Sequence, residues 1–360
     1  MKRESISHVF RMLEPMRKVT LNDVARAAGV SVATASWAIN NNRKVNLTED
    51  TREKVRKAAA ELGYHPNVLA KSLAQGSSSL IGFIADDVAT TPFAGRIIEG
   101  AQDEAWRHGK MLLIINTDEK PTVETSAIRL MGEHQVDGII YSTWYHRPIH
   151  LPDALLNHAV VSVNCFDLQA RCPAVIPNER QGGYDATQEL IHAGHQRIAF
   201  VNTTSPSPAQ TGRLEGYRAA LEKAGIQPDS SLIMYVQADQ EGGYAAAERI
   251  LASQATAVFC HNDRVAMGLY DAFRERGIAI PSDISIIGFD NQEVIAAHLH
   301  PALTSMGLPH YELGVLGVKR LLELRSNPEP LEAGEMNDVT RVTCPIFRRK
   351  SISKVPSKLS

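Results

Sequence analysis

The first regular pattern in the chain is helical and covers residues 20–40, TLNDVARAAGVSVATASWAIN. Apolar and small side chains recur there at the spacing of one helical face, at Leu21, Val24, Ala25 and Ala28. Thr20 and Ser31 are suited to cap two successive helices, and Gly29 tolerates the left-handed backbone that ends the first. The pattern therefore predicts a helix-turn-helix, which can place its second helix in the DNA major groove. An ordinary helical hairpin is the alternative.

A third helix is predicted over residues 48–62, TEDTREKVRKAAAEL, with Thr48 as its cap and acidic residues in its first turn. Its apolar stripe consists of Val55, Ala58, Ala59 and Leu62. The stretch 67–74, NVLAKSLA, can form a short helix, and the GSSS at 76–79 then gives a flexible linker. A small helical module is therefore followed by a hinge.

From Leu80 onwards the pattern changes to buried strands that alternate with helices. The segments SLIGFIADD, GRIIEGAQDEAWRHG and DGIIYSTW are echoed later, in the same order, by RIAFVNT, GRLEGYRAALEKAG and TAVFCHND. The repetition predicts two similar α/β lobes, each built on a parallel sheet. We expect the chain to cross between the lobes near residues 177–182, 304–309 and 337–341.

A parallel sheet binds ligands beyond the carboxyl ends of its strands, so two facing lobes would share a cleft there. Polar or aromatic residues that follow predicted strands are Asp86, Trp144, Asn262 and Asp290, and Arg213 opens the matching helix of lobe two. Arginine donates a planar fork, whereas carboxylate and amide oxygens accept from hydroxyl groups. The alternatives are a core or rim position for Trp144 and a strand-end cap for Asp290. For Asp263 we expect a local bond at its helix start.

Charge is distributed unevenly along the chain. Residues 1–76 hold 13 Lys and Arg against 7 Asp and Glu, a net charge of +6, and the remainder holds 25 against 33, a net charge of −8. A basic helical module joined to an acidic remainder of the chain indicates that only the module binds a polyanion. The simpler interpretation of the basic residues is a solvated surface.

Other classes of protein find little support in the sequence. It has no P-loop, no GxGxxG after a strand and no GxSxG elbow, so an enzyme is not predicted. The scattered histidines lack a third ligand at metal-site spacing. The cysteines, without CxxC pairing, indicate small core residues in a reducing compartment: Cys165, Cys172, Cys260 and Cys344. Neither a membrane span nor an export signal is expected.

The stretches VTLNDVARAAGVSVATAS, TREKVRKAAAELGYHPN and LAKSLAQG resemble, in this order, the headpiece and hinge of the lactose-repressor (LacI/GalR) family of bacterial transcription regulators. The resemblance covers essentially residues 18–350. It implies a small all-α headpiece and an α/β core of two parallel-sheet lobes like that of periplasmic binding proteins. The expected parts are a disordered extension (1–17), the headpiece (18–64), a hinge and linker (65–79), a core (80–349; lobe one about 80–178 and 307–338, lobe two about 179–305 and 340–349) and a basic tail (350–360).

By this resemblance, Val32, Ala33 and Trp37 occupy the positions that usually reach base edges. The sequence departs from the family pattern here, because Arg is common at the Trp37 position and polar residues are frequent at the other two. Apolar side chains offer only contacts such as that to a thymine methyl group, so we expect specificity to depend more on the hinge and on DNA shape. The alternative for Trp37 is a partly core position.

Leu73 matches the leucine wedge with which the family opens the minor groove when the hinge becomes helical on operator DNA. The alternative is a plain linker residue. Contacts to phosphates, which position the protein without specifying sequence, are expected from Thr20, Ser31, Thr34, Asn40 and Arg43.

In the core, the resemblance implies polar ligand contacts from Arg213, Asn262 and Asp290 and aromatic packing from Phe93 and Phe259. This set suits a sugar or sugar derivative, and a purine-like ligand would also fit. No cofactor is expected besides this small-molecule effector.

The sequence thus indicates a ligand-responsive repressor of sugar-utilisation genes. It would bind a near-palindromic operator as a homodimer in the cytoplasm, on the bacterial nucleoid. Release by an inducer and tightening by a corepressor both stay open. A solute-binding protein for transport would need an export signal and no headpiece, and an enzyme on the same scaffold would need a nucleophile or an acid–base pair in the cleft.

Overall fold

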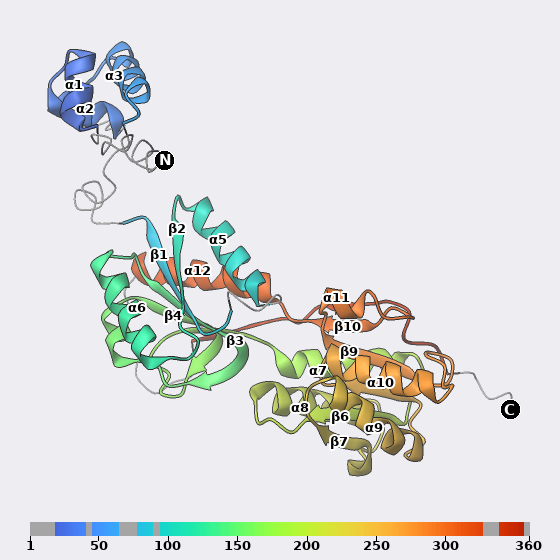
Figure 1. Ribbon diagram of the computed structural model, residues 1–360. Helices are drawn as coiled ribbons and strands as arrows, with labels where there is room; N and C mark the ends of the chain where they lie inside the picture. The colour runs from blue at the N-terminus through green and yellow to red at the C-terminus, as the bar shows by residue number, and fades with distance from the viewer. Residues whose placement is uncertain (1–18, 41–44, 65–77, 89–93, 327–337, 356–360) are drawn as a thin grey trace, which may run out of the picture. The chain divides into compact units, whose positions relative to one another are not determined.

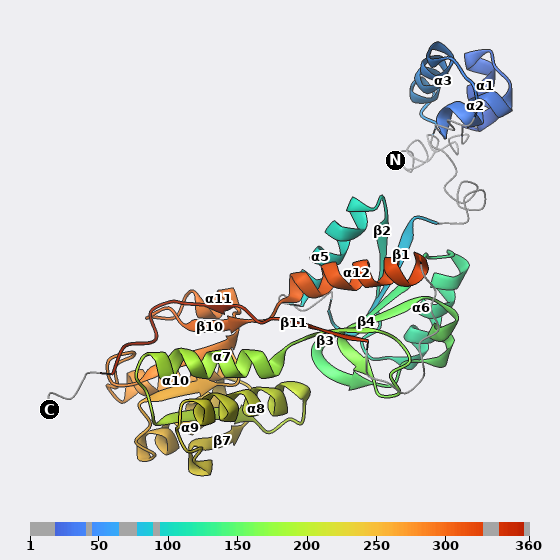
Figure 2. The same cartoon turned by 180° about the vertical axis from the view of Figure 1, so that it is seen from behind.

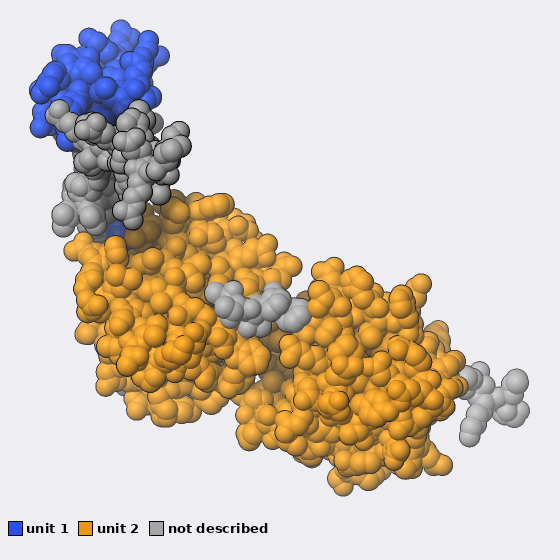
Figure 3. All heavy atoms as spheres, viewed as in Figure 1, with its two compact units in different colours: residues 1–78 blue, residues 79–360 orange. Residues whose placement is uncertain are grey.

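The computed structural model describes residues 19–40, 45–64, 78–88, 94–326 and 338–355. The chain divides into two compact units, residues 1–78 and residues 79–360 (Figure 3). The first is helical and the second is an α/β structure with two sheets. The part of the chain that the model describes contains no helix long and apolar enough to cross a membrane.

The first unit contains three helices, α1 (Leu21–Ala28), α2 (Val32–Ile39) and α3 (Glu49–Glu61). Local chemistry fixes their ends. The Thr20 hydroxyl accepts from the Asp23 backbone N–H, and the Asp23 carboxylate accepts from the Thr20 backbone N–H, which completes a capping box. Gly29 ends α1 at φ +64°, in the left-handed region that favours glycine.

The next two helices are capped as the sequence predicts. Ser31 Oγ accepts from the Thr34 N–H at 3.1 Å, and Thr48 Oγ1 accepts from the Thr51 N–H at 3.4 Å. The buried core between the helices is mostly alanine, and these small side chains let the helices approach closely. It consists of Val24, Ala25, Ala28, Ala35, Ala38, Val55 and Ala58. The turn and its crossing helices are therefore specified largely by local sequence.

Lobe one of the second unit is built on a six-stranded sheet in the order β11-β5-β4-β3-β1-β2, and all its strand pairs are parallel. The strands are β1 (Leu80–Ala85), β2 (Met111–Asn116), β3 (Ile139–Ile149), β4 (Val160–Asp167), β5 (Ala174–Pro177) and β11 (Val339–Val342). The helices are α5 (Gly95–Arg107), α6 (Pro121–Glu133), α12 (His310–Ser326) and the 3₁₀ turn η1 (Asp153–Asn157).

Alternate residues of β1 point to opposite faces of this sheet. Ile81 and Phe83 lie in a core with residues of α5 and α12, whereas Ile84 lies in a core with residues of α6. Figures 1 and 2 show these helices on the two faces of the sheet. Because helices cover both faces of the sheet, β1 has no polar side chain at any position of its sequence, LIGFIA.

Lobe two carries a second six-stranded sheet in the order β12-β10-β9-β8-β6-β7, with only the β10–β12 pair antiparallel. The strands are β6 (Ile198–Thr203), β7 (Ile233–Val236), β8 (Ala257–Cys260), β9 (Ser285–Asp290), β10 (Thr304–Gly307) and β12 (Ile346–Phe347). The helices are α7 (Glu179–His192), α8 (Pro208–Lys223), η2 (Ser230–Leu232), α9 (Gln240–Ala252), α10 (Asp263–Glu275) and α11 (Glu293–Ala296).

The two lobes repeat one arrangement, which confirms the predicted fold. The strand order β3-β1-β2 of lobe one corresponds to β8-β6-β7 of lobe two. In each lobe, a glycine that follows a glutamate in the repeated helical segment allows two helices to pack closely. Gly100 lies where α5 crosses α12, and Gly216 lies where α8 crosses α7. A Cβ at Gly100 would lie 2.0 Å from the Tyr311 carbonyl oxygen, and one at Gly216 would lie 2.2 Å from the Arg180 carbonyl oxygen.

The third crossing between the lobes lies later than predicted. Strand β11 pairs with β5 over residues 339–342, so this segment belongs to lobe one and the chain crosses at residues 343–345. The other crossings follow β5 and β10, which places residue 307 in lobe two. The short apolar pattern of β11 could not indicate which sheet it would join.

The prediction of a separate basic tail from residue 350 was wrong, because the first residues of that segment pack on lobe two. Ser351 is buried, its Oγ accepts from the Thr304 N–H at 2.8 Å, and it donates to the Ile286 carbonyl oxygen at 2.6 Å. Buried His195 holds the same segment, with Nε2 at 3.1 Å from the Ser353 carbonyl oxygen.

We predict that Ser351→Ala lowers the free energy of unfolding by about 2 kcal/mol, because it leaves a buried N–H and a buried carbonyl group without a partner. Urea unfolding followed by circular dichroism measures the change. Lys354→Ala, a truncation at an exposed position of the same segment, is the matched control and should leave the stability unchanged. Equal stabilities of both variants and the wild type would show that the segment is not packed.

Candidate functional site

The exposed face of α2 is the candidate contact surface of the first unit. Val32 and Trp37 are 43% and 38% exposed, and Ala33 is also exposed, whereas Ala35 and Ala38 on the opposite face are buried. The three residues predicted to reach bases therefore share the open side of the helix. Large apolar side chains that remain on a small surface are candidates for a contact with a partner.

Polar groups border this face. Thr20 and Ser31 cap the helix starts, the Ser31 and Thr34 hydroxyls lie 2.8 Å apart, and Asn40 Nδ2 donates to Ser36 Oγ at 3.3 Å. Two predicted contacts, Arg43 and Leu73, lie outside the described residues.

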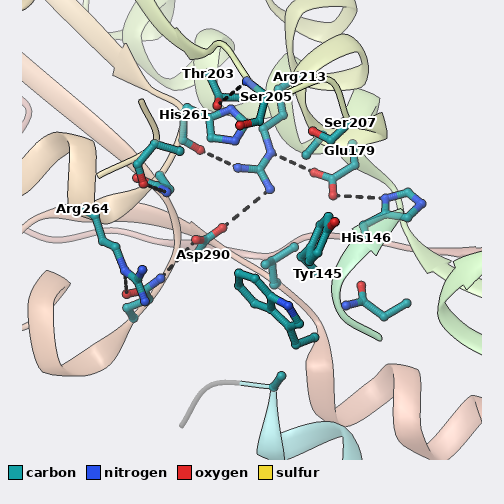
Figure 4. Close-up of a pocket in the computed structure, with 18 of the residues that line it drawn as sticks. Tyr145, His146, Glu179, Thr203, Ser205, Ser207, Arg213, His261, Arg264 and Asp290 are labelled. Atoms are coloured by element: carbon teal, nitrogen blue, oxygen red, sulfur yellow. Dashed lines mark hydrogen bonds and ion pairs between the residues drawn. The ribbon is translucent and has the colours of Figure 1, made fainter. Parts of the chain in front are cut away.

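In the second unit, a pocket of about 400 Å³ lies between the two lobes (Figure 4). Its walls come from the carboxyl ends of β6, β8, β9 and β10 in lobe two and from β3 in lobe one. Position relative to strand ends therefore predicted where the pocket lies. Its volume suits a small organic molecule.

The buried Arg213 is the centre of the lobe-two wall. Its Nε donates to Glu179 Oε2 at 2.8 Å, its Nη1 donates to the His261 carbonyl oxygen, and its Nη2 lies 3.6 Å from Asp290 Oδ1. The guanidinium also lies over the Phe289 ring, 3.6 Å from the ring centroid. Two carboxylates thus compensate a charge that would otherwise be costly to bury.

The network extends to lobe one through a histidine. His146 of β3 places Nδ1 3.3 Å from Glu179 Oε1, and both side chains are almost completely buried. This contact joins β3 to the first turn of α7, so it crosses between the lobes (Figure 4).

The protonation states follow from these contacts. Burial favours the neutral acid at Glu179, but Arg213 and then His146 outweigh burial and lower its pKa to about 2. Burial raises the pKa of Asp290, and Arg213 opposes that rise. Burial, followed by the charge of Arg213, holds the pKa of His261 well below its usual range, which keeps this imidazole neutral.

The aromatic side of the pocket comes from lobe one. Trp144 and Tyr145 are 39% and 40% exposed, with ring centroids 4.8 Å apart in an edge-to-face arrangement. Trp144 therefore lies on the rim and not in the core. Asp86 does not line the pocket but supports it, because its Oδ1 accepts from the Trp144 N–H at 2.9 Å and its Oδ2 pairs with Arg147 at 3.1 Å.

Asp290 is presented by a turn with an unusual backbone. Asp290 and Asn291 have φ values of +93° and +49°, a region that few non-glycine residues adopt. Two hydrogen bonds from its backbone support the turn. The Asn291 N–H donates to Ser305 Oγ at 3.1 Å, and the Gln292 N–H donates to the Asp263 carboxylate at 2.6 Å. Such a strained, well-supported turn is typical of a functional position.

Two predicted residues, Phe259 and Asp263, behave differently from expectation, and Phe93 lies outside the described residues. Phe259 is fully buried and stacks on Phe200 at 4.6 Å, so the structure places it in the lobe-two core and not on the pocket wall. Asn262 lines the pocket, but it caps α10 through the Val265 N–H and donates to the Ala238 carbonyl oxygen.

The second residue that differs from expectation is Asp263. Instead of the expected local bond, it accepts from Ser305 Oγ at 2.6 Å and from the Gln292 N–H, far along the chain. Tyr145, His146 and Glu179 are among the wall residues that sequence reasoning missed. Glu179 carried a signal, since it follows the short strand AVIP at a predicted lobe crossing.

Comparison with known proteins identifies the class. The model for bacterial regulatory proteins of the lacI family matches residues 20–67, and that for periplasmic binding proteins and the sugar-binding domain of the LacI family matches residues 78–350. The chain belongs to the LacI family of bacterial transcription regulators, which confirms the resemblance. Among the described residues, no group of three or more His, Cys, Asp or Glu side chains could hold a metal ion.

Individual relatives agree. The transcriptional repressor PurR of Vibrio atlanticus is 36% identical over 84% of this chain and 91% of its own length. Catabolite control protein A of Priestia megaterium is 32% identical over 88% and 95%. The structure of a lac repressor dimer bound to operator and the anti-inducer ONPF covers 94% of this chain and 100% of its own, with a TM-score of 0.74 and 26% identity.

We predict that ionised Glu179 contributes roughly 3 kcal/mol to folding, because its pKa falls from 4.5 to about 2 on folding. A lowered carboxyl pKa stabilises the fold above about pH 4.5, and the stabilisation is lost as the pH falls towards 2. Urea unfolding at several pH values should therefore show the gap between wild type and Glu179→Gln narrowing with acid. A gap that stays constant below pH 4.5 would contradict this assignment.

Proposed function

We propose that this protein is a ligand-responsive repressor that binds a near-palindromic operator as a homodimer through the exposed face of α2. The observation that carries the proposal is the pairing of a helix-turn-helix, whose second helix exposes one face, with a pocket between two lobes. Val32, Ala33 and Trp37 contact bases, and Leu73 acts as a minor-groove wedge. Thr20, Ser31, Thr34, Asn40 and Arg43 contact phosphates.

The effector is a sugar or sugar derivative. Trp144 and Tyr145 offer aromatic faces against which a ring can pack, and Asp290 offers carboxylate oxygens to its hydroxyl groups. Arg213 and Asn262 complete the polar wall, and Asp86 supports the rim. The structure of CelR in complex with cellobiose, at 26% identity and a TM-score of 0.60, supports an effector of this class.

The protein acts by binding and not by catalysis, in the cytoplasm and on the nucleoid. A ligand that binds the open and closed lobe arrangements with different affinity shifts the balance between them, and that balance controls DNA binding. His146 and Glu179 contribute a contact that changes when the lobes move relative to each other.

Operator binding by the full chain should weaken steeply with salt, because every phosphate that the basic N-terminal unit neutralises releases counterions. With about six phosphate contacts, the affinity should fall roughly a thousandfold between 50 and 200 mM salt. Fluorescence anisotropy on a labelled duplex measures this slope. An affinity independent of salt would contradict binding through the basic unit.

Arg213→Ala should abolish the response to the effector while operator affinity stays within about threefold of wild type. The reason is that the substitution leaves Glu179 and Asp290 without the cation that holds them and so disturbs the pocket wall, whereas the first unit is untouched. Arg348→Ala, which removes an arginine from a surface pair with Glu189, is the matched control and should respond normally. A retained response in Arg213→Ala would place the effector elsewhere.

A further inference from the structure

The charges that line the pocket are already balanced within the protein. The lining includes two carboxylates and two guanidinium groups, on Glu179, Asp290, Arg213 and Arg264, together with the imidazoles of His146, His261 and His310. The arginine charges that a ligand meets in the pocket are therefore matched in number by carboxylates.

The charge of Arg213, the buried cation, is already shared by two carboxylates. Glu179 and the His261 carbonyl group take Nε and Nη1, and Asp290 lies beside Nη2. The face of the guanidinium is covered by the Phe289 ring. A phosphate or carboxylate bound to this cation would compete with these two carboxylates for its charge and would add a further negative charge beside them, which is costly in a buried site.

The remaining guanidinium does not change this balance. Arg264 is exposed, its Nε lies 3.4 Å from Gln292 Oε1, and its charge acts on Asp290. An exposed cation that shares a carboxylate holds an anion weakly. His261 supplies no charge, because its imidazole is held neutral.

From this arrangement we propose that the pocket selects an uncharged effector and excludes phosphorylated or carboxylated ones, with Glu179 as the internal counter-ion that enforces the selection. The inference rests on the proposed function, since it specifies the effector of the same pocket. An uncharged molecule uses Asp290 as a hydroxyl acceptor without disturbing the Arg213–Glu179 pair. An anion meets two carboxylates that already hold the guanidinium.

Substitution of the counter-ion tests the proposal directly, with inorganic phosphate as the probe. Isothermal titration should detect no saturable phosphate binding by the wild-type chain up to 10 mM. Glu179→Gln removes one negative charge from Arg213 and should lower the phosphate Kd at least tenfold. Asp290→Asn makes the same charge change from the other side of the guanidinium and should also gain phosphate binding, so the test does not depend on the folding of one variant.

Glu189→Gln is the matched control. It removes a carboxylate from an arginine pair on the same helix, α7, but at the surface and away from the pocket lining, so phosphate binding should not increase. Wild-type phosphate binding that disappears in Arg213→Met would overturn the proposal. So would phosphate affinities in Glu179→Gln and Asp290→Asn no higher than in Glu189→Gln.

Operator binding of the same samples separates this inference from the proposed function. If Glu179→Gln and Asp290→Asn gain phosphate binding but no sample, including the wild type, binds operator specifically, the proposed function is refuted. The charge selection of the pocket then still holds. Operator binding without any gain of phosphate binding would refute the charge selection alone.

Discussion

The pocket depends on one buried guanidinium. A charge at the position of Arg213 is tolerated only when oppositely charged and polar groups surround it, and those groups come from the start of α7, the end of β8 and the end of β9. The same interaction therefore fixes three strand and helix ends of lobe two relative to one another. It also orders the wall against which a ligand would lie.

Through Glu179 the guanidinium is linked to the other lobe. His146 contributes the contact from β3, and its Nε2 is buried without a hydrogen-bond partner among the described residues. A buried polar atom that lacks a partner raises the energy of the arrangement that contains it. The contact between His146 and Glu179 is thus attractive, but it leaves the His146 Nε2 atom buried without a partner. Such a balance is suited to a junction at which the two lobes adopt more than one arrangement.

Local chemistry made much of this fold predictable. Thr20, Gly29 and Ser31 specify helix ends through contacts within four residues. The repeated order of strand and helix segments, which include Gly100 and Gly216, predicted the duplication of the lobes. Strand ends located the pocket because the carboxyl ends of parallel strands share one edge.

What sequence reasoning missed depends on partners far along the chain. Phe259 and Asn262 both lie near the end of β8, yet tertiary packing buries the first in the core and leaves the second on the pocket wall. Asp263 has the local signature of a helix start, but its partner Ser305 comes from β10. Ser351 pairs with backbone groups of other strands, which a basic terminal composition does not indicate.

The most direct test of ligand-controlled DNA binding is anisotropy of labelled DNA from upstream of the gene for this chain. It is measured with the full chain against a scrambled duplex of equal length, with and without a panel of uncharged sugars and nucleobases. We expect preferential binding to the upstream duplex and a saturable change in that affinity with one member of the panel. Equal affinity for the two duplexes, unchanged by every ligand, would contradict the account.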